Sequence, residues 1–181
     1  MVCFDQEEYY EQDINCLFFR ADENYVDGQL KYLEKGNTQV VAEKIQSLTG
    51  GELFKIEAEK SYAKDYTTCV EQAHQDQVAN VFPKLKQTLK DISQYDEIYL
   101  GYPNYWSTMP MAVFTFLTSV DTSGKLIHPF CTHEGSGFGQ SLKDLEKLCP
   151  QARITSGLSL YGSKVVQLEK DVEQWVQSKG E

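Results

Sequence analysis

The chain has 181 residues, of which 41% are hydrophobic and 24% are charged, and its formal net charge at pH 7 is -10. This length and composition fit one globular domain and exclude a wholly disordered chain. The negative charge argues against nucleic acid and against an anionic membrane surface, since both require a basic protein face. An acidic surface suits docking to basic partner proteins, although acidity also simply keeps a protein soluble.

The cysteines and the start of the chain indicate a cytoplasmic protein. The five cysteines are odd in number and none forms a CxxC pair, which favours buried thiols in a reducing compartment over a disulfide framework. The first residues lack the features of a signal peptide, and no run approaches the roughly 20 apolar residues of a membrane span. Residues 1–13 carry five acids. We expect them to form an acidic, partly disordered extension of a single domain over residues 14–181.

Predicted strands and helices alternate from residue 14 onward. The first strand, Ile14–Phe19, is a continuous apolar run, as expected of a strand covered on both faces. A helix follows at Thr38–Thr49 and stops at two glycines. The later elements, in chain order, are a strand at Glu52–Glu57, a helix at Asp65–Asn80, a strand at Glu97–Tyr102, a helix at Pro110–Val120, a strand at Lys125–Cys131, a helix at Gln140–Leu148, a strand at Arg153–Leu160 and a helix at Lys164–Ser178.

This alternation predicts an α/β fold with a parallel sheet, right-handed crossovers and helices on both faces. Such an architecture has three layers and is doubly wound. Ligands bind to these sheets at the carboxyl ends of the strands, where the winding direction reverses. The loops after the first, third and fourth strands should therefore meet at one edge.

The first of these loops runs from Arg20 to Thr38 and predicts an anion site. It ends with Lys35-Gly36-Asn37-Thr38 at a helix start, where free N–H groups and the positive end of the helix dipole attract anions. Gly36 allows close approach of the backbone, and Asn37 and Thr38 can cap the helix or hydrogen-bond a phosphate. The alternative is an ordinary capped helix after a long loop.

The second loop, Tyr102–Pro110, predicts a contact with a flat ligand. Two prolines stiffen it, and Tyr105 and Trp106 place large rings on a turn that is expected to be polar. The alternative is that Trp106 caps the core. The candidate binding residues are Pro103, Asn104, Tyr105, Trp106, Ser107 and Thr108.

The third loop, Thr132–Gly139, alternates glycines with polar residues directly after a buried strand. Glycines allow a ligand to lie against bare backbone, where amide groups can bind the polar edge of a ring. The spacing does not fit the dinucleotide motif G-x-G-x-x-G. The candidate residues are Thr132, His133, Glu134, Gly135, Ser136, Gly137 and Gly139.

Together the three loops predict a site for flavin mononucleotide (FMN). One loop suits a phosphate, one suits stacking, and one offers amides to the O2, N3 and O4 edge of an isoalloxazine. The proximity of Cys131, His133 and Glu134 also invites a metal site, but Cys131 ends a buried strand and is expected to pack as a small hydrophobe. We therefore assign no metal ligand and no catalytic acid or base.

The second and third loops resemble those of the flavodoxin family. The resemblance lies in Gly-Tyr-Pro-Asn-Tyr-Trp-Ser-Thr-Met-Pro-Met over 101–111 and Pro-Phe-Cys-Thr-His-Glu-Gly-Ser-Gly-Phe-Gly over 129–139. It is strongest to a bacterial flavodoxin-like branch with a Gly-Tyr-Pro-x-Trp-Trp loop. The resemblance implies a five-stranded sheet in 2-1-3-4-5 order and bound FMN. It places residues 36–38 at the phosphate, 105–108 beside the isoalloxazine and 132–139 along its polar edge.

The phosphate loop departs from the flavodoxin pattern. The family usually opens a very short loop with Ser or Thr, whereas this chain has Phe19-Arg20 there and an insertion, Ala21–Glu34. Arg20 would replace the lost hydroxyl contact with a charge-assisted one. The insertion, with Tyr25 and Tyr32, would either cover the flavin or be disordered when the site is empty.

Three functions fit these residues. The first is a one-electron carrier between a reductase and an acceptor protein. The second is an FMN-dependent NAD(P)H:quinone or nitro-compound oxidoreductase that acts on a small quinone-like acceptor, with His133 as proton donor. The third is a binding module whose flavin site has decayed, as the insertion would suggest.

Overall fold

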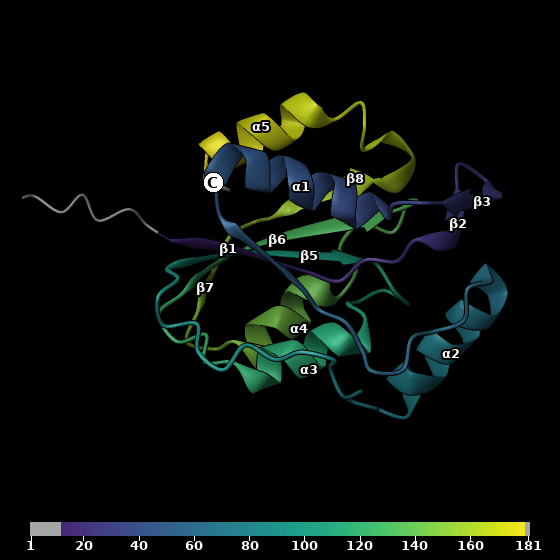
Figure 1. Ribbon diagram of the computed structural model, residues 1–181, viewed down its shortest axis with the longest axis horizontal. Helices are drawn as coiled ribbons and strands as arrows, with labels where there is room; N and C mark the ends of the chain where they lie inside the picture. The colour runs from purple at the N-terminus through teal and green to yellow at the C-terminus, as the bar shows by residue number, and fades with distance from the viewer. Residues whose placement is uncertain (1–11, 180–181) are drawn as a thin grey trace, which may run out of the picture.

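A computed structural model of the protein describes residues 12–179. Its centre is a parallel sheet in the order β4-β1-β5-β6-β7, with β8 also paired to β6 (Figure 1). If β7 and β8 are taken together as the fifth strand, the predicted order 2-1-3-4-5 is confirmed. The strands are β1 (Asp13–Leu17), β4 (Glu52–Lys55), β5 (Glu97–Pro103), β6 (Leu126–His133), β7 (Arg153–Ile154) and β8 (Leu158–Tyr161).

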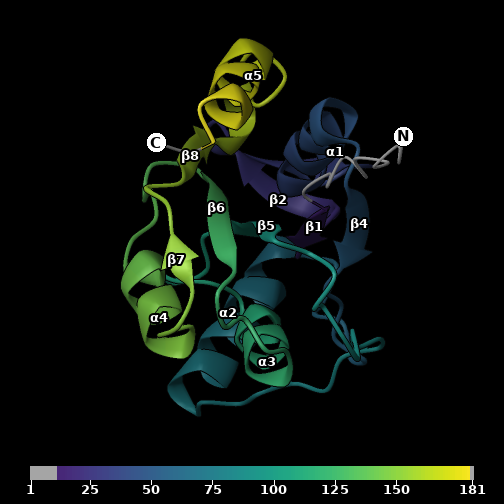
Figure 2. The same ribbon diagram turned by 90° about the vertical axis from the view of Figure 1, so that its left-hand side faces the viewer.

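Helices cover both faces of the sheet, as predicted (Figures 1 and 2). The helices are α1 (Asn37–Thr49), α2 (Tyr66–Val78), α3 (Met111–Ser119), α4 (Ser141–Leu148) and α5 (Glu169–Gln177). Helices α1 and α5 lie on one face, and α3 and α4 on the other. Two buried apolar clusters fill the layers, one around Ile45 and Trp175 and the other around Phe116 and Leu145. This division makes the fold a three-layer sandwich.

The insertion forms a β-hairpin, although the sequence analysis assigned no strand to residues 21–34. Strands β2 (Asp22–Val26) and β3 (Gln29–Leu33) pair antiparallel. Asp27 and Gly28 join them with φ values of 53° and 77°. Positive φ at both central residues is what a tight hairpin turn needs, and Asp-Gly is a strong signal for such a turn. Figure 1 places the hairpin beside α2.

The fifth strand is split, whereas one strand over Arg153–Leu160 was predicted. Strand β7 pairs with the start of β6 and β8 with its end. Residues 155–157 therefore lie opposite residues 128–129, which makes a bulge. Gly157 has φ 76°, and a Cβ there would lie 2.6 Å from the carbonyl oxygen of Pro129. Only glycine fits at position 157, where the segment between β7 and β8 passes this close to the Pro129 backbone.

The last helix begins later than the predicted Lys164. A 3₁₀ turn, η1 (Gly162–Lys164), and further turns precede α5, which starts at Glu169. The β-branched pair Val165-Val166 lies in this irregular stretch, where such residues disfavour a helix. Val165, Val172 and Trp175 of this segment are nevertheless buried.

Three further predictions concern the N-terminal extension, the cysteines and membrane-spanning segments. Residues 1–11 of the predicted extension lie outside the described residues, and Asp13 already belongs to β1. The four cysteines within residues 12–179 are free and buried, as expected of packed thiols. Within the same range, no helix has the length and apolarity to cross a membrane.

Candidate functional site

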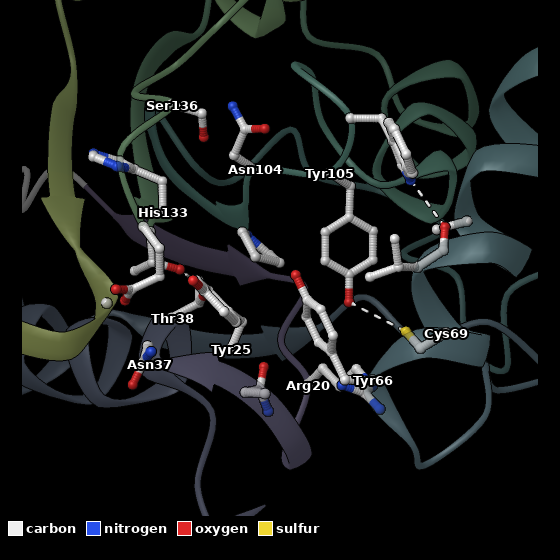
Figure 3. A pocket seen from close by; sticks show the side chains of 18 of the residues that line it. Arg20, Tyr25, Asn37, Thr38, Tyr66, Cys69, Asn104, Tyr105, His133 and Ser136 are labelled. Carbon is white, nitrogen blue, oxygen red and sulfur yellow. Dashed lines mark hydrogen bonds between the residues drawn. The ribbon is translucent and has the colours of Figure 1, made fainter. Parts of the chain in front are cut away.

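A cavity of about 560 Å³ lies where β1, β5 and β6 end, as predicted for the carboxyl edge (Figure 3). This volume is typical of a small-molecule site. Most of the predicted residues line it: Arg20, Asn37, Thr38, Pro103, Asn104, Tyr105, Trp106, Ser107, Thr132, His133, Glu134 and Ser136. The other predicted residues do not line it: Lys35, Gly36, Thr108, Gly135, Gly137 and Gly139.

The N-terminus of α1 has no side-chain cap, although a cap was the alternative to an anion site. Gly36 occupies the N-cap position, and Asn37 and Thr38 follow it into the cavity wall. The Thr38 hydroxyl lies 2.7 Å from the Thr132 hydroxyl, which joins the first loop to the third. A Cβ on Gly36 would lie 2.5 Å from the carbonyl oxygen of Arg20. The close approach at Gly36 is therefore made by the chain's own backbone.

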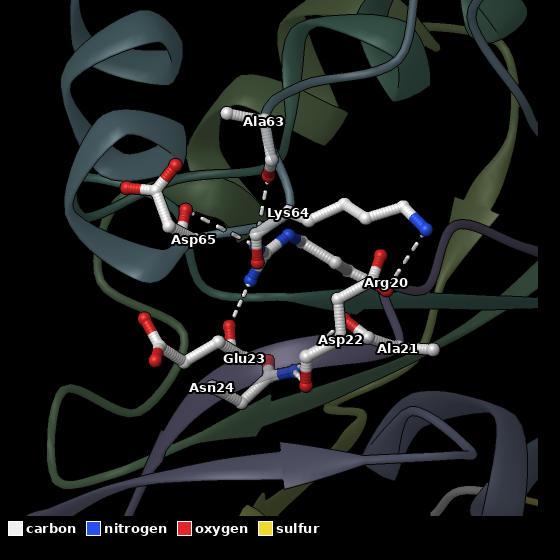
Figure 4. Close-up of polar contacts among 8 residues, drawn as sticks. All are labelled: Arg20, Ala21, Asp22, Glu23, Asn24, Ala63, Lys64 and Asp65. Carbon is white, nitrogen blue, oxygen red and sulfur yellow. Dashed lines mark hydrogen bonds and ion pairs between the residues drawn. The ribbon is translucent and has the colours of Figure 1, made fainter.

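The two predicted phosphate cations are bound to other parts of the protein. The Lys35 ammonium lies 2.6 Å from the Glu43 carboxylate, outside the cavity lining. The Arg20 guanidinium donates to the carbonyl oxygens of Glu23, Ala63, Lys64 and Asp65 (Figure 4). Arg20 still lines the cavity, but these carbonyls accept from both of its terminal nitrogens. Arg20 thus ties two segments together, and its contact with a phosphate in place of the lost hydroxyl stays a prediction.

The second loop forms a tight turn that presents Trp106 to solvent. Tyr105 and Thr108 exchange two backbone hydrogen bonds of 2.8 and 3.0 Å. The two residues between them, Trp106 and Ser107, both have positive φ, 49° and 67°. Backbone in this region is costly without glycine, so the surrounding contacts must hold the turn. The Asn104 side chain does so by accepting from the Ser107 N–H and donating to the Gly137 carbonyl, which links the second and third loops.

Trp106 packs on α2 and does not cap the core. Its side chain is 47% exposed, so the alternative proposed for it is wrong. The indole N–H donates to the Val70 carbonyl at 2.9 Å, and the ring stacks on His74 with centroids 4.1 Å apart. The Gln77 amide donates to the Trp106 carbonyl. Helix α2 thus fixes one wall of the cavity to the second loop.

Tyr105 lines the same cavity, and its hydroxyl points toward Cys69 (Figure 3). Its ring meets Phe18 edge-on with centroids 5.9 Å apart, and its hydroxyl lies 3.9 Å from the Cys69 sulfur. Burial raises the pKa of Tyr105 well above its usual value. The phenol is therefore a neutral, rigid surface for a flat ligand.

The third loop bends through glycines in the left-handed region. Gly135 and Gly137 have positive φ, and a Cβ on either would meet little or nothing. Neither glycine lines the cavity, and the Gly135 N–H already donates to His133, so their contact with a ligand stays a prediction. Gly139 differs, because its Cβ would lie 2.3 Å from the Ser107 carbonyl oxygen. That glycine serves the packing of the third loop on the second.

Both ring nitrogens of His133 are engaged. Nδ1 accepts from the Gly135 N–H at 2.8 Å, and Nε2 lies 2.9 Å from the Ser159 hydroxyl. An accepting Nδ1 requires the tautomer with its proton on Nε2. Burial lowers the pKa of His133, so the ring is neutral at pH 7. This arrangement suits a residue that shapes the loop better than a proton donor to an acceptor molecule.

Glu134 bridges two segments across the cavity. Its carboxylate accepts from the Ser163 N–H at 2.7 Å and from the Asp27 N–H at 3.1 Å. The first bond reaches the turn after β8, and the second reaches the tip of the β2–β3 hairpin. Glu134 thus holds the hairpin over one end of the cavity.

Comparison with known proteins agrees with this geometry. A family model described as flavodoxin matches residues 30–179. The chain belongs to the flavodoxin family. The matched segment starts inside the hairpin, so Arg20 and β2 lie before it. No curated protein sequence matches the chain.

Solved structures share the fold at low sequence identity. A candidate flavoprotein of Bacteroides eggerthii is 22% identical with a TM-score of 0.66, over 92% of this chain and 96% of that one. A Lactobacillus acidophilus flavoprotein in complex with FMN is 18% identical with a TM-score of 0.61, over 87% and 97%. A Fusobacterium nucleatum flavodoxin bound to FMN is 12% identical with a TM-score of 0.52, over 92% and 96%. At these identities the likeness establishes the fold alone.

Helix α2 and the hairpin build a wall of the cavity that the sequence predicted only in part. Tyr25 was named as a residue that would cover the flavin, and it lines the cavity; the lining residues that were not predicted are Asn24, Tyr66, Cys69, Val70, Ala73 and Gly162. The rings of Tyr25 and Tyr66 stack at 6.0 Å with an interplanar angle of 29°. Four of these residues lie on α2 at spacings of three, four and seven, which puts them on one helical face. That stripe was visible in the sequence, but the surface it faces was not.

Proposed function

We propose that this flavodoxin-family protein binds one FMN in the cavity at the carboxyl edge and carries electrons between partner proteins. The observation that supports this most is the convergence of three loops on one cavity. An uncapped helix start, aromatic rings and polar side chains of the third loop come from the ends of β1, β5 and β6. This is the combination that FMN requires.

The ring end of FMN fits the second loop and the part of the third loop that follows Glu134. Tyr105 and Trp106 offer flat apolar surface, and Ser136 of the third loop adds a polar group to the cavity lining. The phosphate end fits the start of α1, where Asn37 and Thr38 supply hydrogen-bonding groups and the helix dipole favours an anion. When bound, FMN supplies the redox chemistry, and the protein sets its access and potential.

The carrier is favoured over the NAD(P)H oxidoreductase by the state of His133. An oxidoreductase of the proposed kind would use this histidine to protonate its acceptor, yet the ring is neutral and both nitrogens are engaged. A net charge of -10 suits docking to basic redox partners, namely a reductase and an acceptor. We further assign the chain to the Gly-Tyr-Pro-x-Trp-Trp branch, from residues 101–106, and to the cytoplasm.

Two assays test the proposal. The apoprotein is titrated with FMN and binding is followed by quenching of flavin fluorescence. The loaded protein is then given NADH or NADPH with a quinone and, after chemical reduction, is mixed with the basic haem protein cytochrome c. We expect FMN binding, negligible NAD(P)H turnover and electron transfer to cytochrome c that slows as salt rises.

The other outcomes separate the competing functions. Rapid NAD(P)H oxidation with quinone reduction would establish the oxidoreductase in place of the carrier. Failure of the protein to bind FMN would establish a module with a decayed site.

A further inference from the structure

The phosphate end of the cavity already contains an anion of the protein's own. Of the described residues that line the cavity, Glu134 is the one with a carboxylate. Its two oxygens each accept a backbone N–H, from Ser163 and from Asp27. Backbone N–H groups are also the donors that commonly bind phosphate oxygens. The Glu134 carboxylate is therefore bound by backbone N–H groups, the same kind of donor that binds phosphate.

Glu134 lies close to the start of α1. A Cβ placed on Gly162 would be 2.4 Å from the Asn37 amide nitrogen and 2.9 Å from a Glu134 carboxylate oxygen. Gly162 thus has the first residue of α1 on one side and the carboxylate on the other. This is the end of the cavity where the FMN phosphate is expected.

Among the described lining residues, no cation forms an ion pair with Glu134. Arg20 is the basic residue of the lining, and its guanidinium donates to four backbone carbonyls. Lys35, next to the helix start, pairs with Glu43 outside the cavity. A phosphate that enters here meets a like charge in a site partly shielded from water, where such repulsion is stronger than in bulk solvent.

We propose that Glu134 determines the specificity of this site for the tail of the flavin, by competing with the phosphate of FMN for backbone donors. The inference rests on the proposed FMN site. The carboxylate reduces the ratio by which the protein binds FMN more tightly than riboflavin, which has the same ring system but no phosphate. Binding of FMN exchanges the Glu134 carboxylate for the phosphate at Ser163 and Asp27, whereas riboflavin leaves the carboxylate in place.

The first experiment compares the affinities of the two flavins. Apoprotein is titrated with FMN and with riboflavin, for the wild type, Glu134→Gln and Glu134→Asp. The control is Glu146→Gln, which removes one exposed carboxylate on α4 outside the cavity. We expect Glu134→Gln to raise the preference for FMN over riboflavin at least about fivefold, which is the effect of removing one nearby like charge.

The controls separate charge from shape. Glu134→Asp keeps the charge, so its preference stays within about twofold of the wild type, as does that of Glu146→Gln. An unchanged or reduced preference in Glu134→Gln overturns the inference. So does an equal rise in Glu134→Asp, because geometry would then explain the effect. If FMN binds and the preference fails to change, this inference alone is lost; if neither flavin binds, the proposed function is lost with it.

Amide hydrogen exchange gives a readout that does not depend on affinity. In Glu134→Gln without ligand, the N–H groups of Asp27 and Ser163 should exchange faster than in the wild type. FMN should restore their protection and riboflavin should not. Restoration by both flavins, or by neither, contradicts the exchange of carboxylate for phosphate.

Discussion

At the scale of single residues, the site depends on close backbone contacts that only glycine permits. Gly139 has φ 55°, and its missing Cβ leaves room for the backbone of Ser107. Ser107 itself has positive φ, and its carbonyl accepts from the Gln140 N–H at 2.6 Å. The strained turn that presents Trp106 is thus supported from the third loop. Strain of this kind persists at functional sites when the surroundings impose it.

Gly139→Ala should destabilise the protein and weaken FMN binding. The new Cβ would meet backbone atoms of Ser107, which cannot move without disturbing the turn. We expect the free energy of unfolding in urea to fall by about 3 kcal/mol, from positive-φ strain and overpacking together. Gly124→Ala is the matched control, since Gly124 has φ 73° but open space around it. In Gly124→Ala the free energy of unfolding should fall by only about 1 kcal/mol. Equal decreases in the two variants would refute the packing role of Gly139.

At the scale of secondary-structure elements, the hairpin and α2 form one unit around Arg20. The guanidinium binds carbonyls on the hairpin and on the segment that leads into α2 (Figure 4). The Glu23 carboxylate adds a bond to the Tyr66 N–H at 2.8 Å, and Tyr25 stacks on Tyr66. Asp65 caps α2 by accepting from the Thr68 N–H. These contacts turn a sequence insertion into a wall of the cavity.

Arg20→Lys should loosen this unit although it keeps the charge. Lysine is a point charge and cannot reproduce the planar fork that binds several carbonyls at once. Charged hydrogen bonds contribute about 1.5–3 kcal/mol each, so exchange of the amides over residues 63–68 should become at least about tenfold faster. Lys64→Ala is the control, because Lys64 is exposed and its ion pair with Asp22 is 3.9 Å long. No difference between these two variants would exclude the tying role of Arg20.

At the scale of the whole molecule, a buried His128–Glu97 pair lies near the starts of β6 and β5, whereas the candidate site lies at the carboxyl ends of these strands. His128 on β6 is fully buried and stacks on Tyr99 at 4.7 Å. Its Nε2 lies 3.0 Å from the Glu97 carboxylate, which also binds the Lys179 ammonium at 3.0 Å. Burial lowers the pKa of His128 despite the opposing effect of Glu97. The folded protein therefore favours the neutral form of the His128 ring.

The stability of the protein should fall in mild acid because of His128. A histidine whose pKa is lowered by folding contributes its full stability above the unfolded pKa of 6.5 and loses it as the pH falls below that value. We expect the free energy of unfolding to decrease between pH 6.5 and about 5, with a slope of at most about 1.4 kcal/mol per pH unit from this group. His128→Gln should flatten the slope, while His74→Gln, at an exposed position, should not. An unchanged slope in His128→Gln would assign the effect to other groups.

Much of the architecture followed from local patterns. Continuous apolar runs predicted the strands, because strands covered on both faces are apolar throughout. Their alternation with helices predicted a parallel sheet, and with it the edge where the three loops meet. The resemblance of residues 101–111 and 129–139 then gave the expected strand order. These signals lie within short segments, so a sequence displays them directly.

Only the tertiary structure decided the roles of the cations, the glycines and α2. Arg20 and Lys35 looked free for a phosphate, yet carbonyls and Glu43 take their donors. Gly36 and Gly139 looked open to a ligand, yet the chain's own backbone fills their space. Their partners lie far away in sequence, and a pattern of residue types does not record which distant group will arrive. The sequence therefore determined where the site is, and the packing determined which of its groups remain available to bind.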